Sequence, residues 1–140
     1  MSETGQNFIA GSWCDGQSPI ANINPSDLSD QIGHYAQADG AQLDRAFDAA
    51  QTAQKKWATI GLEARQTILM NIGNELMERR VELGTLLSRE EGKPLAEGVG
   101  EIYRAGQFFT YYAAEVLRQI GDTADSVRDG IEIDVRREPV

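Results

Sequence analysis

The chain has 140 residues, a length typical of one domain that can bury a core of its own. Its 22 acidic side chains outnumber its 13 Lys and Arg residues, and the net charge of −9 argues against binding to nucleic acid or to an anionic membrane, because both need clustered basic residues. No run of about 18 apolar residues is present, and the single cysteine, Cys14, excludes an intramolecular disulfide and a Cys-rich metal site.

The first third of the chain is predicted to form short strands separated by turns. It begins without the basic and apolar regions of a secretory signal, so we expect a soluble, cytoplasmic protein. Residues 7–13, NFIAGSW, predict a strand pair around Gly11, and residues 19–24 and 31–38 predict two further extended segments. The sequences DGQS and NPSDLSD between them favour turns, because Asn and Asp side chains bond to nearby backbone and Pro fixes its own φ.

The middle of the chain is predicted to be helical. Asp39 caps a first helix whose third residue is Gln42, and one face of this helix carries Leu43, Ala46, Phe47, Ala50 and Trp57. A second helix is predicted from Leu62 to Glu91, with Arg79, Arg80 and Glu82 outward and an apolar face of Leu69, Ile72, Leu76, Leu83 and Leu87. Gly92 suits the left-handed residue that ends a helix, and Pro94 suits the first turn of the next.

A third helix, from about Leu95 to Gln119, has two distinct faces. One is an apolar stripe of Ile102, Gly106, Phe109, Ala113, Val116 and Ile120. The other carries Arg104, Phe108 and Tyr111. Aromatic residues on both sides are not typical of a simple surface helix, so we expect the second face to have a role of its own.

The last ten residues, IEIDVRREPV, alternate between apolar and charged side chains. This pattern predicts a half-buried strand over residues 131–140, with Pro139 inside it and GDTADSVRDG as the preceding turn. A strand needs neighbours for its backbone groups, and the sequence stops at this point. We therefore expect an incomplete domain.

Recognisable catalytic motifs are absent from the sequence. It contains no GxGxxG, GxxxxGK[ST], HExxH or CxxC. Cys14 is interpreted as a small residue beside a strand, and His34 as a structural histidine within one. Glu90 and Glu91 are adjacent on a helix and therefore do not face each other as a catalytic pair. Any function must come from a larger architecture.

An ordered series of motifs resembles a known family. NFIAGSW and DG are followed by NINPSD, then by REEGKPLAEGVGEIYRAGQFFTYYAAE, and finally by DSVRDGIEIDVRREPV. In this order they resemble the amino-terminal region of the aldehyde dehydrogenase superfamily, from about Asn7 to Val140. EEGKPLAE, RAG, YYAAE and VRDG resemble the bacterial 2-oxoglutarate semialdehyde (2,5-dioxovalerate) dehydrogenases, and succinate semialdehyde dehydrogenases rank second.

The resemblance implies an α/β fold, which within this fragment is α+β. It implies amino-terminal strands and three long helices of the NAD(P)-binding domain over residues 1–125. Residues 126–140 would begin the strand used in oligomerisation. The full-length protein is then expected to be a homodimer or homotetramer.

The resemblance also implies a reaction. A cysteine thiolate attacks an aldehyde, a hydride passes to NAD or NADP, and a glutamate activates water to hydrolyse the thioester. In the family the catalytic and cofactor-binding residues lie beyond the position matching Val140. None is therefore assigned to this chain, Cys14 does not match the nucleophile, and the chain alone is expected to be inactive.

Two minor sites are implied within the chain. Arg104, with Phe108 beside it, would face the substrate tunnel and bind the distal carboxylate of a semialdehyde; the alternative is an i,i+3 ion pair between Arg104 and Glu101. A structural monovalent cation would use a backbone oxygen of Ile23 and the carboxylate of Glu90; the alternative for Glu90 is a solvated helix-terminal charge.

Two other interpretations stay open. The chain is alternatively a non-catalytic, acidic α+β interaction module that binds a partner through its helices and a free strand edge. It also remains open that the chain assembles with a separately encoded remainder. If most of the family's central sheet is absent, the helical faces lack their cover, and we predict an exposed apolar surface larger than that of a typical monomer.

Overall fold

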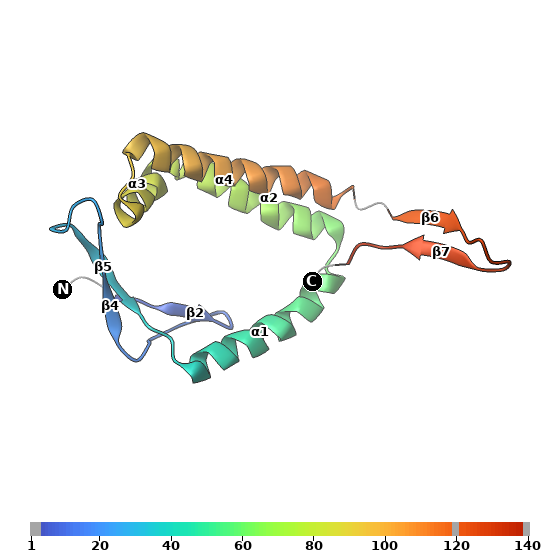
Figure 1. Cartoon of the computed structure of the whole chain (residues 1–140), viewed down its shortest axis with the longest axis horizontal. Helices are drawn as coiled ribbons and strands as arrows, with labels where there is room; N and C mark the ends of the chain where they lie inside the picture. The colour runs from blue at the N-terminus through green and yellow to red at the C-terminus, as the bar shows by residue number, and fades with distance from the viewer. Residues whose placement is uncertain (1–3, 119–120, 139–140) are drawn as a thin grey trace.

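A computed structural model of the chain describes residues 4–118 and 121–138. Short strands lie at both ends of a helical middle (Figure 1). The amino-terminal sheet consists of β1 (Thr4–Gly5), β4 (Pro19–Ile23) and β5 (Gln31–Ala36). Its strand order is β1-β5-β4, in which β4 is antiparallel and β1 parallel to β5. The two longer strands confirm the sequence prediction, whereas β1 was not expected.

The predicted strand pair around Gly11 is also confirmed. β2 (Asn7–Ile9) pairs antiparallel with β3 (Ser12–Cys14). The turn between them places Ala10 at φ 55° and Gly11 at φ 82°, a left-handed conformation that glycine adopts without steric cost. Phe8 and Trp13 face each other across the hairpin, with ring centroids 4.9 Å apart.

Helix α1 (Gly40–Thr59) begins as the sequence predicts, because Asp39 accepts a 2.7 Å hydrogen bond from the Gln42 backbone N–H. The buried Gln42 side chain also donates to the Asp15 carbonyl at 2.6 Å, which ties the helix to the end of the hairpin. At the other end, Nη2 of the buried Arg65 donates to the carbonyls of Ala58 and Ile60. Arg65 therefore fixes the junction between α1 and α2.

The prediction of one helix from Leu62 to Glu91 is wrong. The structure has α2 (Leu62–Glu78) and α3 (Arg80–Glu91), separated at Arg79, where φ is −87° and ψ is 13°. Neither glycine nor proline marks this position, so the sequence carries no local break signal. Both helices pack against a fourth helix, α4 (Leu95–Val116), on either side of this break.

Helix α4 (Leu95–Val116) begins after the left-handed Gly92, whose φ of 71° confirms its predicted role. Pro94 is the residue just before the helix rather than part of its first turn. The predicted end at Gln119, and Ile120 of the apolar stripe, lie outside the described residues. The packing face of α4 contains the buried Gly98, Gly106 and Ala113.

The last two strands form a separate hairpin, β6 (Asp122–Asp125) with β7 (Glu132–Val135). It projects from one end of the molecule (Figure 1). The sequence prediction is wrong in two respects. The segment predicted as a turn contains β6, which pairs with β7, and the predicted half-buried strand is fully exposed, as is every residue of both strands. β7 ends at Val135, and Pro139 lies outside the described residues.

Apolar side chains are poorly covered throughout the described part of the chain. There, Ala113 is the only buried apolar residue, and no large side chain is fully buried. On α1, Leu43 is 53% exposed and Phe47 is 66% exposed. The predicted lack of cover is wrong for the facing sides of α2 and α4, which pack on each other: Leu69, Leu76, Phe109 and Val116 are half-buried, and Ala113 is buried. No described helix combines the length and the hydropathy that crossing a membrane requires.

Candidate functional site

The outer face of α4 carries the residues predicted to meet substrate. Arg104, Phe108 and Tyr111 are all exposed and follow one another at spacings of four and three residues, which places them on one side of the helix. This side lies opposite the packing face. Phe108 and Tyr111 are 57% and 59% exposed, and Tyr111 also contacts Tyr112 edge-on at 5.2 Å. The result is a basic group flanked by aromatic surface.

The carboxylate that would neutralise Arg104 is engaged elsewhere. Glu101 accepts a 2.6 Å hydrogen bond from Lys93, which also pairs with Glu91. These contacts, led by the one with Glu101, raise the pKa of Lys93. Arg104 has no ion-pair partner among residues 4–118 and 121–138. The alternative of an Arg104–Glu101 ion pair is therefore wrong.

The second predicted site lies where the β4–β5 region meets the end of α3. Asn22, the neighbour of Ile23, donates a 2.8 Å hydrogen bond to the Glu90 carboxylate, so Glu90 is held against β4. Nearby, the Ser26 hydroxyl donates to the Gly92 carbonyl at 2.6 Å. The described residues contain no group of three or more His, Cys, Asp or Glu side chains that could hold a metal ion.

The same junction contains a two-bond ion pair that the sequence did not reveal. Arg89 donates to both oxygens of Asp30, at 2.9 and 2.6 Å. Asn24 donates to Asp30 as well, at 3.2 Å. The hydrogen bonds from Arg89 and then from Asn24 lower the pKa of Asp30 to about 2. Together these contacts hold the β4–β5 turn on α3.

Cys14 and His34 make contacts suited to structural roles. The Cys14 thiol donates to the Asn7 carbonyl at 3.4 Å, across the β2–β3 hairpin. Nδ1 of His34 lies 3.4 Å from the side-chain nitrogen of Gln31 on the same strand. Neither contact links a nucleophile to a base, so neither residue forms the start of a catalytic triad.

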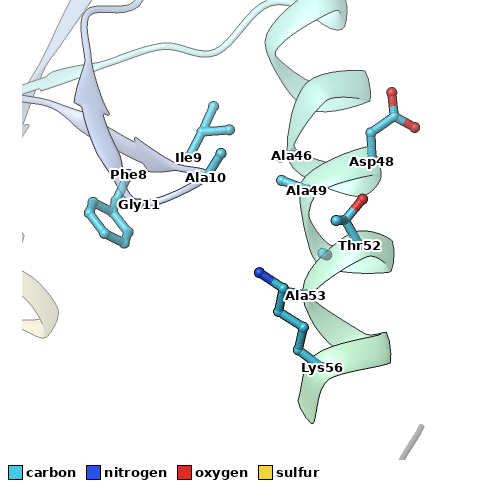
Figure 2. A pocket seen from close by; sticks show the side chains of 11 residues that line it. Phe8, Ile9, Ala10, Gly11, Ala46, Asp48, Ala49, Thr52, Ala53 and Lys56 are labelled. Atoms are coloured by element: carbon cyan, nitrogen blue, oxygen red, sulfur yellow. The ribbon is translucent and has the colours of Figure 1, made fainter. Parts of the chain in front are cut away.

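A pocket of about 660 Å³ lies between the tip of the β2–β3 hairpin and α1. In Figure 2, Ile9 and Ala10 face α1 across this space, where Ala46, Ala49 and Ala53 line the opposite wall. Lys56 extends toward the hairpin, whereas the Asp48 carboxylate points away from it. The pocket thus has apolar walls without an acid–base pair. Sequence analysis did not predict this pocket, because the pocket forms only where the β2–β3 hairpin packs over α1.

Comparison with known proteins gives a consistent result. Residues 13–140 match the model of the "Aldehyde dehydrogenase family". The chain is 34% identical over 137 residues to succinate-semialdehyde dehydrogenase [NADP(+)] GabD of Escherichia coli, covering 96% of this chain and 28% of that protein. It is 32% identical over 122 residues to alpha-ketoglutaric semialdehyde dehydrogenase of Bacillus subtilis, covering 86% of this chain and 25% of that protein.

A solved structure extends the likeness to three dimensions. The NAD-dependent benzaldehyde dehydrogenase of Corynebacterium glutamicum superposes with a TM-score of 0.81 and 32% identity, over 91% of this chain and 28% of that chain. The chain thus spans about a quarter of the length of the curated relatives it matches. Because the family model covers nearly all of its residues, the chain belongs to the aldehyde dehydrogenase family.

Proposed function

We propose that this chain forms the amino-terminal part of an NAD(P)-dependent dehydrogenase that oxidises a semialdehyde to a carboxylate. 2-Oxoglutarate semialdehyde is the first choice of substrate, and succinate semialdehyde is the second. Family membership supports the reaction class. The two curated relatives described above are named for such semialdehydes, and each of these aldehydes carries a carboxylate at its far end.

The unpaired Arg104 is the observation that carries the substrate proposal. An exposed guanidinium with no ion-pair partner in the described part of the chain is available for a ligand carboxylate, which it can bind through two parallel hydrogen bonds. Phe108 and Tyr111 would line the approach and hold the carbon chain of the substrate. In this proposal Arg104 binds and orients the substrate and takes no part in bond making.

A nicotinamide cofactor belongs to the proposal only through the relatives, one of which is named for NADP and another for NAD. The described residues form no binding site for this cofactor, because they contain no glycine-rich loop for its phosphates. They also contain no nucleophile paired with a base for the chemical step. The chemical step would be supplied by polypeptide outside this sequence. What these residues would contribute is binding of the substrate carboxylate.

The substrate proposal can be tested in a chimera. In this chimera the 140 residues of the chain are followed by the segment that comes after the matched region in the E. coli relative. Changing Arg104→Ala should raise KM for 2-oxoglutarate semialdehyde by about 10²-fold, the usual cost of losing a charge-assisted pair. KM for an uncharged aldehyde of similar length should stay within about twofold, because no carboxylate is lost.

Two controls separate binding from folding. Arg104→Lys should recover part of the affinity, since it keeps the charge but loses the two-bond geometry. Arg45→Ala removes an exposed arginine from α1 and should leave both KM values unchanged. An equal rise of KM for charged and uncharged aldehydes would show a structural role for Arg104, and an unchanged KM would remove it from the site.

For a structural monovalent cation we propose Ile23, through its carbonyl, and Glu90 as ligands. The Asn22–Glu90 hydrogen bond supports this, because it holds the carboxylate beside β4. Further ligands would be backbone carbonyls or water, since hard cations prefer oxygen ligands. Replacing KCl by tetramethylammonium chloride should lower the Tm of the chimera but not of its Glu90→Gln variant; equal Tm values would reject the site.

We further propose that residues 1–125 belong to the cofactor-binding domain and that residues 126–140 begin the oligomerisation strand of a homodimer or homotetramer. The exposed β6–β7 hairpin supports the second part, because a lone two-stranded ribbon is marginally stable and gains from another strand at its edge. Sedimentation of the chimera with and without an Ile133→Pro change tests it: the change should produce monomers.

A further inference from the structure

An aspartate followed by glycine is a position where the polypeptide backbone is chemically reactive. The side-chain carboxyl can react with the backbone nitrogen of the next residue and close a five-membered succinimide ring. Glycine favours this attack because it has no side chain to hinder it and adopts many backbone conformations. The sequence contains three such pairs, whose aspartates are Asp15, Asp39 and Asp129. How firmly the structure holds each carboxyl group therefore decides which of them reacts.

Two of the three carboxylates are held by hydrogen bonds. The oxygens of Asp39 accept from the Gln42 backbone N–H at 2.7 Å and from the Gln17 side chain at 2.9 Å, at the start of α1. The Asp15 carboxylate accepts a 2.8 Å hydrogen bond from the Gln6 side chain, and the Asp15 carbonyl accepts one of 2.6 Å from Gln42. Ring closure at either aspartate requires that such bonds break first.

The third carboxylate is free to react. Asp129 lies in the turn between β6 and β7, where its side chain is exposed. Within residues 4–118 and 121–138 this carboxylate makes neither an ion pair nor a hydrogen bond. The following Gly130 has a φ of 74°, and a Cβ built on it would have no neighbour within 4 Å. The surroundings therefore leave room for the carboxyl group to reach the Gly130 nitrogen.

We propose that Asp129 is a modification site, at which isoaspartate forms spontaneously with water as the only other reactant. The Gly130 nitrogen bonds to the side-chain carboxyl carbon of Asp129, and one water leaves with a carboxyl oxygen and the amide proton. A second water then opens the ring at either carbonyl. One opening restores aspartate, and the other routes the main chain through the side chain. The mass is unchanged, and nothing is oxidised or reduced.

The product adds one carbon to the main chain inside a closed turn. The Ser126 N–H donates to the Ile131 carbonyl at 3.3 Å, and the Ile131 N–H donates to the Arg128 carbonyl at 3.4 Å. Because Asp129 lies between these partners, the longer main chain should break the Arg128–Ile131 bond and weaken the pairing of β6 with β7. The hairpin is sensitive to such a change, since a lone two-stranded ribbon is marginally stable.

Incubation of the whole 140-residue chain at neutral pH and physiological temperature tests the proposal. Electron-transfer fragmentation of its peptides distinguishes isoaspartate from aspartate at each position. Isoaspartate should form at least about 5-fold faster at Asp129 than at Asp15 or Asp39, because each hydrogen bond that must break first slows ring closure by roughly that factor. Asp129→Glu should abolish the product at this position, since glutamate would have to close a six-membered ring, which is much slower.

A release variant checks the physical reason. Gln6→Ala removes an exposed side chain that holds the Asp15 carboxylate. It should raise isoaspartate at Asp15 several-fold and leave the rate at Asp129 unchanged. As a second readout, a carboxyl methyltransferase specific for isoaspartate, supplied with its sulfonium methyl donor, should methylate the aged chain far more than the fresh one.

Three results would overturn the inference. These are an absence of isoaspartate at Asp129, equal rates at the three positions, and a rate at Asp15 that Gln6→Ala does not change. The measurement requires neither an aldehyde nor a cofactor, so its outcome is independent of the proposed function.

Discussion

At the scale of single residues, paired charges connect segments that are distant in the sequence. The Arg89–Asp30 pair joins α3 to the turn before β5, and its two hydrogen bonds make it more specific than a surface ion pair. Lys93 joins the α3–α4 turn to Glu101. Because Lys93 engages Glu101, Arg104 makes no ion pair within the described residues, as is also true of other basic side chains such as Arg45.

The Asp30 carboxylate predicts an acid-sensitive contribution to stability. Its pKa is lowered in the folded chain to about 2, below the ordinary value of 3.8, so its contribution is present above about pH 4 and is lost as the pH falls toward 2. The Asp30→Asn variant should therefore lose less free energy of unfolding than the unchanged chain over this pH range. Urea titrations at several pH values measure it.

Asp44→Asn is the matched control for this measurement. Asp44 is exposed on α1 and has no ion pair within the described residues. Its variant should show the same loss of stability on acidification as the unchanged chain. If Asp30→Asn behaves like this control, the Arg89–Asp30 pair does not form in solution.

At the scale of elements, glycines set how closely the helices approach. A Cβ built on Gly73 of α2 would lie 2.8 Å from the Gly106 carbonyl oxygen of α4, and one on Gly84 of α3 would lie 2.6 Å from the Val99 Cα. Both helices therefore contact α4 through backbone, with small residues at the crossing points. The three-helix unit α2–α3–α4 depends on these positions.

Two glycine substitutions should have opposite effects. Gly73→Ala forces α2 and α4 apart and should destabilise the chain by about 1–3 kcal/mol. Gly100→Ala, on the open side of α4 where an added Cβ has no neighbour within 4 Å, should stabilise it by about 0.5–1 kcal/mol. Urea unfolding followed by circular dichroism measures both, and effects of the same sign would contradict the packing.

At the scale of the whole molecule, exposed apolar surface is the dominant property. The described residues bury a single apolar side chain, Ala113, whereas aromatic residues such as Phe47 and Phe108 are more than half exposed. A protein of this length normally buries a core of large side chains. The chain on its own is therefore an open assembly of helices and hairpins (Figure 1).

This surface predicts dye binding and association. The isolated chain should enhance the fluorescence of anilinonaphthalene sulfonate several-fold under native conditions, and its sedimentation coefficient should rise with concentration, since large exposed apolar patches associate. Both effects should be much smaller in the chimera. A monomer that binds no dye at any concentration would show that the helices collapse onto one another.

Much of the local structure followed from the sequence. The Asp39 cap, the Gly92 terminator and the hairpin at Gly11 depend on side-chain hydrogen bonds or on φ angles that one residue type favours. The two faces of α4 followed from helical periodicity. Family membership was also evident, because ordered motifs extend over nearly the whole chain.

The tertiary structure decided what depends on contacts between distant segments. The break at Arg79 has no local signal; it arises because α2 and α3 must both reach α4. Alternation in residues 131–135 predicted a buried face, yet burial requires a covering layer, and the described chain provides only β6. The sequence alone left Glu101 as a candidate partner of Arg104. The fold showed that Glu101 instead binds Lys93, because the turn at Gly92 brings Lys93 back over α4.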